Sequence, residues 1–356
     1  MNADDEHTSP ETWVSPETDD ILRAAGAGNM PQASVAIFAR WWQLETWLRE
    51  LAYVELRSLY GSSWESAAAA AMGRQSQDAK FPHMASVDGD NPLAYLDYSQ
   101  LLQLIEDHDA QLRYALLEPG TWNSRQDELK RIRHRIGHMR RPHRDDLSRL
   151  EQTLRDLERG AFIACASYNR RRTPDPKQHR DPITVGWIAR QHGGARRLIE
   201  HADTIYDVSF ALLTSRRPWA TYPAELENAP GILWHAVFHL RRSEIDLKKL
   251  WREAHGISPL IVHLIADYPG HVEFTFSAMD DAPLIAKAIE HAFNCVLGSR
   301  RYGAREDPED WDLWRQRMGA IDYRVQSGSG WSIVDETTLP LSTFGAGGGV
   351  EFAPTW

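Results

Sequence analysis

The hydrophobic pattern of the first half of the chain repeats at helical spacing. Between Ala33 and Tyr60 no glycine or proline interrupts a series of apolar residues three or four positions apart, and Gly61 follows. Such a series predicts one long helix that ends at Gly61. Further helices are predicted over 66–72, from about 91 to 116, from 123 or 124 to Pro142, and from Pro142 onward. We therefore expect the N-terminal half to be all-helical.

The pattern of the second half is different. Four short runs rich in β-branched and aromatic residues, at 206–213, 232–240, 260–265 and 271–276, predict strands. Longer periodic segments at 245–254 and 282–297 predict helices between and after them. This order favours an α+β domain whose sheet, antiparallel or mixed, is covered by helices on one face.

Five segments follow from these changes of pattern. We expect a flexible acidic tail over 1–30, a helical domain over 31–170, a linker over 171–182, an α+β domain over 183–325 and a glycine-rich tail over 326–356. A chain of 356 residues is long enough for two domains. A hydrophobic content of 42% with 25% charged residues excludes a wholly disordered chain.

Charge and cysteine content narrow the class of protein. The two cysteines, Cys165 and Cys295, lie far apart in apolar stretches, so neither a disulfide framework nor a cysteine metal site is indicated. No run of apolar residues has the length of a signal peptide or a membrane span. We therefore expect a cytoplasmic protein without a membrane partner, a metal or another cofactor.

One segment is basic although the whole chain has a net charge of −10. From Arg125 to Arg149 there are nine lysines or arginines, four acidic residues and the histidines His134, His138 and His143. A positive patch of this kind attracts phosphate backbones. Cleavage of RNA without a metal needs a base near neutral pKa, a proton donor and a cation for the developing phosphorane charge, and histidine and arginine supply these.

The run from Leu129 to His138, LKRIRHRIGH, resembles the signature of the HEPN superfamily, which is an arginine, a polar residue, three further residues and a histidine. Segments 44–49, 60–64 and 96–98 resemble HEPN helices in the expected order, so the resemblance covers about residues 33–165. It implies a helical bundle that commonly forms homodimers and cleaves RNA at a composite, metal-independent site.

The resemblance also implies roles for individual residues. Arg133 and His138 would be catalytic, and His134 would occupy the polar position, which is often asparagine in the family. Glu45 would support the site, although it could equally form an i,i+4 ion pair with Arg49. The backbone of the RNA would be held by Arg131, Arg135, Arg140 and Arg141. A toxin or phage-defence role is what the family implies. We expect the C-terminal domain to regulate or target this activity, and an antitoxin or another regulatory partner to bind the protein.

Four other interpretations remain. The basic segment is also typical of a solvated helix face, or of a HEPN-like domain that has lost activity and only binds or dimerises. A DNA-binding regulator is a further class, but no helix-turn-helix spacing supports it. His235 and His239 have the i,i+4 spacing of zinc ligands, yet the residues around them alternate as in a strand and no third ligand is near, so a metal site is disfavoured.

Overall fold

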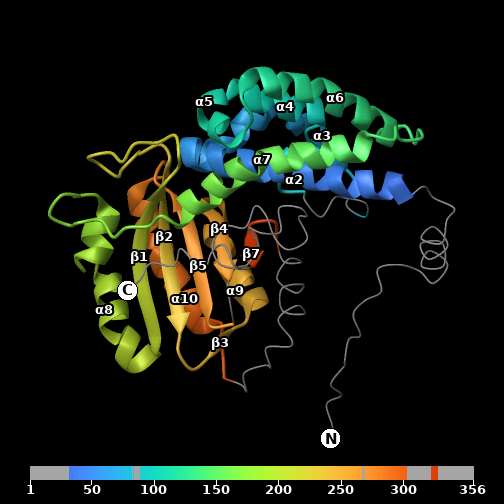
Figure 1. Cartoon of the computed structure of the whole chain (residues 1–356). Helices are drawn as coiled ribbons and strands as arrows, with labels where there is room; N and C mark the ends of the chain where they lie inside the picture. Colours follow the sequence, from blue (N-terminus) through green and yellow to red (C-terminus); the bar gives the residue numbers. More distant parts are fainter. Residues whose placement is uncertain (1–31, 82, 84–88, 267–268, 303–321, 328–356) are drawn as a thin grey trace, which may run out of the picture.

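The computed structural model describes residues 32–81, 83, 89–266, 269–302 and 322–327. The predicted tails therefore lie outside the described residues, apart from 326–327. The chain is an α+β protein in which an N-terminal helical region lies across one end of a C-terminal sheet (Figure 1). No helix in the described ranges has both the length and the apolar character that crossing a membrane requires.

The helical region is built on the long helix predicted from the sequence. That helix, α2, spans Gln32–Tyr60, and Gly61 follows it at a positive φ of 59°. The other helices of this region are α3 (Met72–Asp78), α4 (Tyr98–Asp107), α5 (Asp109–Leu112), α6 (Pro119–Gly137) and α7 (Asp146–Asn169). Short 3-10 segments cover Gly61–Ala71, Pro92–Tyr95 and Arg113–Ala115.

Two predicted helices differ from the observed ones. The helix expected over 91–116 is broken, because Asp97 forms a capping box that starts α4 and His108 leaves helical geometry where α4 ends. The short helix expected over 66–72 is the end of a 3-10 segment that passes into α3. Both differences arise from capping and backbone geometry that hydrophobic spacing does not report.

The C-terminal region contains a five-stranded sheet in the order β1-β2-β5-β4-β7. All its pairs are antiparallel except β4 with β7, which is parallel. Its strands are β1 (Val208–Arg216), β2 (Ile232–Leu240), β4 (Ile261–Ala266), β5 (His271–Ser277) and β7 (Val325–Ser327). The four strands predicted from the sequence are confirmed.

Helices and two short strands complete this region. The predicted helices are α9 (Leu247–Glu253) and α10 (Ala282–Gly298), while α8 (Gly193–His201) and the π-helical turns Thr184–Ile188 and Ala202–Tyr206 were not predicted. A two-stranded ladder pairs β3 (Glu244–Ile245) with β6 (Arg300–Arg301).

The two faces of the main sheet have different chemistry. One face is aromatic and packs against α10, with the rings of Phe238 and Phe293 at 5.2 Å. The opposite face is polar and is covered at one end by α7, whose Tyr168 ring lies 5.1 Å from that of His235. Buried polar side chains of this face are Ser215, His235, His263, Glu273 and Thr275. A polar face that is buried must satisfy its hydrogen bonds internally.

The junction between the helical region and the sheet is a buried polar network. Glu55 of α2 accepts hydrogen bonds from the guanidinium of Arg217, at 2.9 and 2.5 Å, and from the indole of Trp219 at 2.6 Å. The hydroxyl of Tyr53 donates to the carbonyl of Val262 at 2.7 Å. The apolar core of the helical region also continues onto the sheet at Leu233, Val262 and Ile265. The core of the helical region therefore includes residues of the sheet, while a second cluster lies between the sheet and α10.

The segment predicted as a linker is attached to the sheet at its start. Arg171 forms an ion pair with Glu273. Arg172 forms an isolated antiparallel bridge with Thr214, so the chain leaving α7 continues along the outer edge of β1. These contacts fix the end of α7 against the polar face of the sheet.

Candidate nucleic-acid interface

Helix α6 carries the basic segment, and its own sequence explains how it is placed. Glu118 caps the helix by accepting hydrogen bonds from the backbone of Gly120 and Thr121, and Pro119 occupies the first turn. One face is buried against the bundle through Trp122, Gln126, Leu129 and Ile132. The remaining faces are left to the charged residues.

The helix ends earlier than the sequence predicted. We expected Pro142 to stop it, but the last helical residue is Gly137. The backbone N–H of Arg140 donates to the carbonyl of Arg135 at 2.8 Å, and that of Met139 donates to Ile136 at 3.0 Å. This pair of bonds is a Schellman motif, with Met139 in the left-handed region at φ 53° where glycine is usual. Helix α7 likewise begins at Asp146 rather than at Pro142.

The histidines of the basic segment lie together at this helix end. His134 is in the last turn and His138 is the C-cap residue, and both are exposed. Their ring centroids are 4.5 Å apart at an interplanar angle of 66°. A Cβ atom added to Gly137 would meet no atom of the described chain within 4 Å, so the surface between the histidines is open. Two imidazoles at this distance can serve as a base and an acid for one substrate.

Arg133 lies elsewhere on the helix. Its side chain is half-buried, and its guanidinium carbon is 6.0 Å from the ring centroid of Tyr98. Burial raises the pKa of Tyr98, the nearby Glu45 raises it further, and Arg133 opposes them. Five residues of α-helix advance about 7.5 Å along the axis, which separates Arg133 from His138. Among the described residues Arg133 lies beside Tyr98, and no contact between its guanidinium and either histidine is found.

Glu45 borders the same aromatic neighbour as Arg133. It accepts hydrogen bonds from the indole of Trp41 at 2.6 Å and from Arg49 at 2.5 Å. The ring of Trp41 in turn lies 4.8 Å from that of Tyr98. The i,i+4 ion pair with Arg49 that the sequence suggested is thus present, and Glu45 is within the electrostatic reach of Tyr98.

The four arginines expected to hold RNA fall into two groups. Arg131, Arg140 and Arg141 are exposed, and no ion pair is found for them among the described residues. Arg135 instead makes a bidentate ion pair with the buried carboxylate of Asp146, with Nε at 2.7 Å from Oδ2. This pair ties the end of α6 to the start of α7, so Arg135 has a structural partner that the sequence alone did not indicate.

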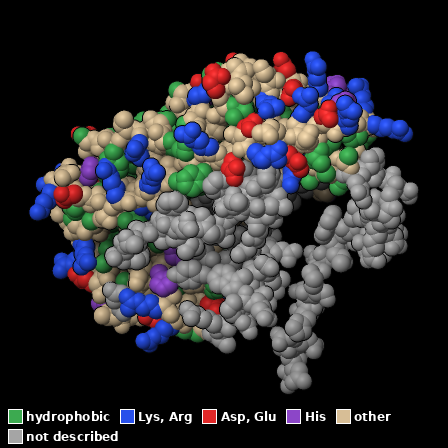
Figure 2. Space-filling view, viewed as in Figure 1, with side chains coloured by type: hydrophobic (Ala, Val, Ile, Leu, Met, Phe, Trp, Pro, Cys, Tyr) green, Lys and Arg blue, Asp and Glu red, His purple; other side chains and the backbone are tan. Residues whose placement is uncertain are grey.

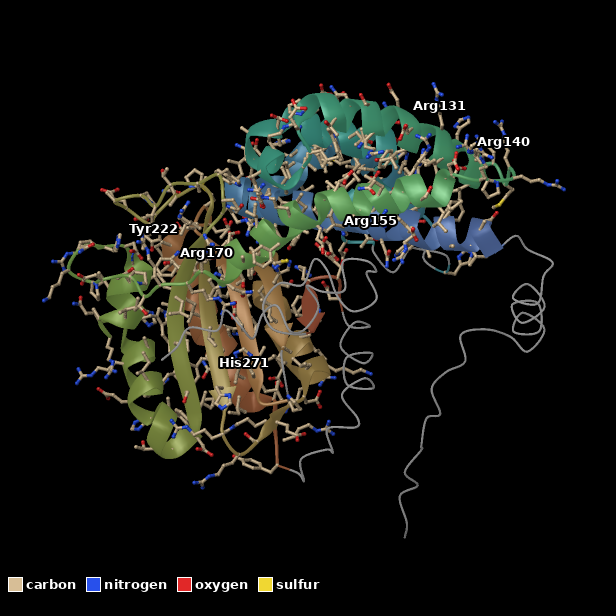
Figure 3. The ribbon with its side chains drawn as sticks, in the orientation of Figure 1. Arg131, Arg140, Arg155, Arg170, Tyr222 and His271 are labelled. Atoms are coloured by element: carbon tan, nitrogen blue, oxygen red, sulfur yellow. The ribbon has the colours of Figure 1, made fainter. Side chains whose placement is uncertain are left out.

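The charged residues at the end of α6 are positive. From Lys130 to Arg141 the chain has six basic residues and no acidic residue. Farther along the helices two arginines have acidic partners, since Arg125 pairs with Asp156 and Arg149 with Glu128. Figure 2 shows Lys, Arg and His side chains gathered at this end of the helical region, and Figure 3 shows Arg131 and Arg140 pointing outward from it. We call residues 130–141 the basic tip.

A second cluster of chemically capable residues lies inside the molecule, and the sequence had not assembled it. Ser215 Oγ is 2.7 Å from His235 Nε2, and His235 Nδ1 is 2.8 Å from Glu273 Oε1. The three residues come from β1, β2 and β5 and are buried. Polar residues at alternating strand positions were the available signal, but strand register, not local sequence, brings them together.

The cluster also resolves the two histidines considered as metal ligands. His235 is fully buried and hydrogen-bonded to protein side chains. His239, four residues later on the same face of the strand, is half-buried. Within the described ranges no group of three or more His, Cys, Asp or Glu residues has the arrangement of a metal site.

Comparison of the chain with protein-family models, curated proteins and solved structures finds no match.

Proposed function

We propose that this protein is a metal-independent endoribonuclease of the HEPN type, with its site at the basic tip. The observation that carries the proposal is the pair of exposed histidines, His134 and His138, with rings 4.5 Å apart. The pair lies in a segment with six basic residues and no acidic one. Adjacent imidazoles and unpaired arginines are the groups that cleavage of RNA by its own 2′-hydroxyl requires.

Each group has a defined part in this reaction. One imidazole, with His138 as the principal candidate, accepts the proton of the 2′-hydroxyl as that oxygen attacks phosphorus. A protonated imidazole gives a proton to the departing 5′-oxygen, and His134 is placed to share this work. Arginine stabilises the added negative charge on the phosphorane. The exposed Arg131, Arg140 and Arg141 hold the RNA backbone on either side.

The position of Arg133 favours a homodimeric site. In one chain the guanidinium of Arg133 lies over Tyr98. A second copy would supply the missing cation. An apolar stripe of Val35, Phe38 and Trp42, each at least half exposed, lies on α2, and an ion pair between Arg40 and Glu151 holds this part of α2 beside α7. Exposed large apolar residues near a charged site are typical of a protein interface.

The proposal is tested by RNA cleavage with EDTA present. We expect purified wild-type protein to cleave total cellular RNA, and His138→Ala and Arg133→Ala each to lower the rate at least about 100-fold, because a proton-transfer group or a charge stabiliser is lost. His255→Ala and Arg155→Ala remove the same residue types from exposed positions elsewhere and should cleave like wild type. Cleavage that requires a metal, or that survives both site substitutions, would contradict the proposal.

An inactive binding module is the second candidate function. The half-buried position of Arg133 in the single chain favours it, because a catalytic cation must reach the phosphate. The same preparation distinguishes the two candidates. RNA binding that depends on Arg140 and Arg141, together with no cleavage by the dimeric wild-type protein, would identify a binding module.

A role for the C-terminal region follows from the junction. The network of Glu55, Arg217 and Trp219 links α2 to the sheet. A ligand or partner that binds the sheet would therefore act on α2, the helix that carries the apolar stripe. We infer that the α+β region regulates or targets the ribonuclease. A toxin or defence effector, controlled by an antitoxin partner, is the cellular role that this arrangement suits.

A further inference from the structure

One member of the buried trio Ser215, His235 and Glu273, the serine, lines a cavity. The cavity has a volume of about 370 Å³ and lies between the end of α7 and the end of β1. Ser215 lines it together with Thr214 of the same strand. A serine whose hydroxyl is bonded to a histidine is thus at the wall of a space large enough for a small molecule.

The hydrogen bonds of the trio fix the positions of its protons. Burial alone would raise the pKa of Glu273, but Arg171 and His235 outweigh it and hold the pKa at about 2, so the carboxylate is ionised. It accepts the Nδ1–H of His235. Burial lowers the pKa of His235, which is therefore neutral, and its Nε2 lone pair accepts the Ser215 hydroxyl proton. This order of acid, base and hydroxyl is the one that activates a serine nucleophile.

The lining of the cavity indicates the charge of its ligand. Three arginines, Arg170, Arg172 and Arg216, line it, and none of its lining residues is acidic. The guanidinium of Arg172 lies over the ring of Tyr222, which belongs to the loop between β1 and β2, and Figure 3 labels Tyr222 together with Arg170, the residue after α7. The side chain of Arg170 has no ion-pair partner among the described residues. An apolar wall from Phe162, Ile163 and Ala166 completes the space.

We propose that Ser215 is the nucleophile of a second active site, which hydrolyses carboxylic esters of small anionic acids. Ser215 Oγ bonds to the ester carbonyl carbon and its proton passes to His235 Nε2. The bond from that carbon to the alcohol oxygen breaks, and the alcohol leaves with the proton. Water then adds to the acyl carbon and gives a proton to His235. The Ser215 ester bond breaks, Oγ recovers the proton and the carboxylic acid is released.

The arginines give this site its selectivity. A carboxylate on the acyl group would pair with Arg170, whose guanidinium has no ion-pair partner among the described residues, while the apolar wall packs against the carbon chain. The same positive field favours the negative charge that develops on the carbonyl oxygen. A neutral acyl group of the same length would lack the ion pair.

A small alkyl fluorophosphonate tests the nucleophile directly. We expect the full-length protein to be labelled at Ser215, identified by peptide mass, and Ser215→Ala to abolish the label. Ser277→Ala is the matched control, because Ser277 is a buried serine on β5 that makes no bond to a histidine in the described structure, and it should be labelled like wild type. Glu273→Gln should slow labelling at least about 10-fold.

The substrate class is tested with 4-nitrophenyl esters. We expect the succinate hemiester to be hydrolysed at least about 10-fold faster than the butyrate ester, and Arg170→Gln to remove this preference while leaving the label on Ser215. Absence of labelling in the folded wild type, or hydrolysis unchanged by Ser215→Ala, would overturn the proposal and leave the trio a structural hydrogen-bond network. RNA cleavage at the basic tip does not use these residues, so the two proposals fail independently.

Discussion

At the scale of single residues, Met139 has the most unusual backbone of the basic tip. Its φ of 53° places an L-residue in the left-handed region, at the position of a Schellman motif that glycine normally occupies. The side chain is 93% exposed, so no packing compensates for the backbone geometry. Backbone strain of this kind is often found at functional sites, and here it is adjacent to His138.

Replacing this residue should therefore stabilise the protein. We expect Met139→Gly to raise the free energy of unfolding by about 0.5–1 kcal/mol, because glycine adopts the left-handed conformation without a Cβ clash. Urea denaturation of both proteins measures the change. Arg140→Gly, one residue farther on, is the control and should give no gain. Equal stability of Met139→Gly and wild type would show that the turn is not strained.

The end of α6 near Met139 shows which features of the basic tip could be predicted from the sequence and which could not. The local excess of arginine and histidine predicted the basic tip, because the charge of a segment can be read directly from its sequence. The end of α6 was placed at Pro142 because proline is a strong helix breaker, whereas the observed turn uses a methionine that has no turn propensity. The pairing of Arg135 with Asp146 was missed for a related reason, since it depends on how α6 and α7 meet.

At the scale of elements, the basic tip should bind the phosphates of RNA through individual arginines, and the contribution of each arginine can be measured. Each arginine that contacts a phosphate of single-stranded RNA contributes about 0.7 to the slope of log K against log salt concentration. We expect Arg140→Ala to reduce this slope by about 0.7, and the double variant with Arg141→Ala to reduce it by about 1.4. Fluorescence anisotropy with a labelled oligonucleotide measures both slopes.

A matched arginine elsewhere controls for loss of net charge. Arg155 is exposed on α7 and lies away from Arg140 in Figure 3, with its guanidinium donating to Gln152. Arg155→Ala should leave the slope unchanged. If Arg140→Ala and Arg155→Ala changed the slope equally, the protein would bind RNA by its general charge and the tip would have no special role.

The strands show a different limit of sequence reasoning. Short runs rich in β-branched and aromatic residues predicted β1, β2, β4 and β5 with their ends within three residues. The alternation of the residues around His235 also placed it on a strand. The partners of His235 could not be predicted, because Ser215 lies 20 residues before it and Glu273 lies 38 residues after it, and only the observed register makes them neighbours.

At the scale of the whole molecule, the buried polar face should make stability depend on pH well above the range of carboxyl groups. Burial, together with the nearby Arg217 and Arg57, lowers the pKa of His263 to about 3. Burial lowers the pKa of His235 in the same direction. The unfolded chain takes up protons on these histidines below about pH 6.5, but the folded protein does not.

Because of this difference, the free energy of unfolding decreases as the pH falls. The stabilisation from the neutral histidines is complete above about pH 6.5 and is lost as the pH falls below it. We expect the free energy of unfolding to fall by up to about 1.4 kcal/mol per pH unit for each buried histidine. Glu273, with its pKa near 2, adds a further loss only below its ordinary value of 4.5.

Urea denaturation at pH 7.5, 6.5, 5.5 and 5.0 measures this dependence before carboxyl groups titrate. His263→Gln keeps a polar partner for Tyr168, which lies 3.1 Å from His263 through its hydroxyl, and should flatten the curve. His255→Ala removes an exposed histidine and should not change it. Stability independent of pH between 7.5 and 5.0 would mean that the buried histidines become charged in the folded state.

The junction of helices and sheet was the part of the molecule farthest from prediction. The sequence suggested two domains joined over 171–182, because that segment is rich in arginine and proline. The structure instead contains a buried ion pair between Glu55 and Arg217, which are 162 residues apart, and a core that passes from one region to the other. Local sequence patterns do not report pairs of this separation.

The shared core also has a consequence for the order of events during protein synthesis. The ribosome delivers α2 early, but Tyr53 and Arg57 bond to residues 260–262, about 200 positions later. At 5–20 residues per second, this delay is roughly 10 to 40 s. During this interval the inner end of α2, with Glu55 still lacking Arg217, remains uncovered on the nascent chain. A chaperone that binds nascent polypeptides would find its target there, and the basic tip would be complete before the region that we propose controls it.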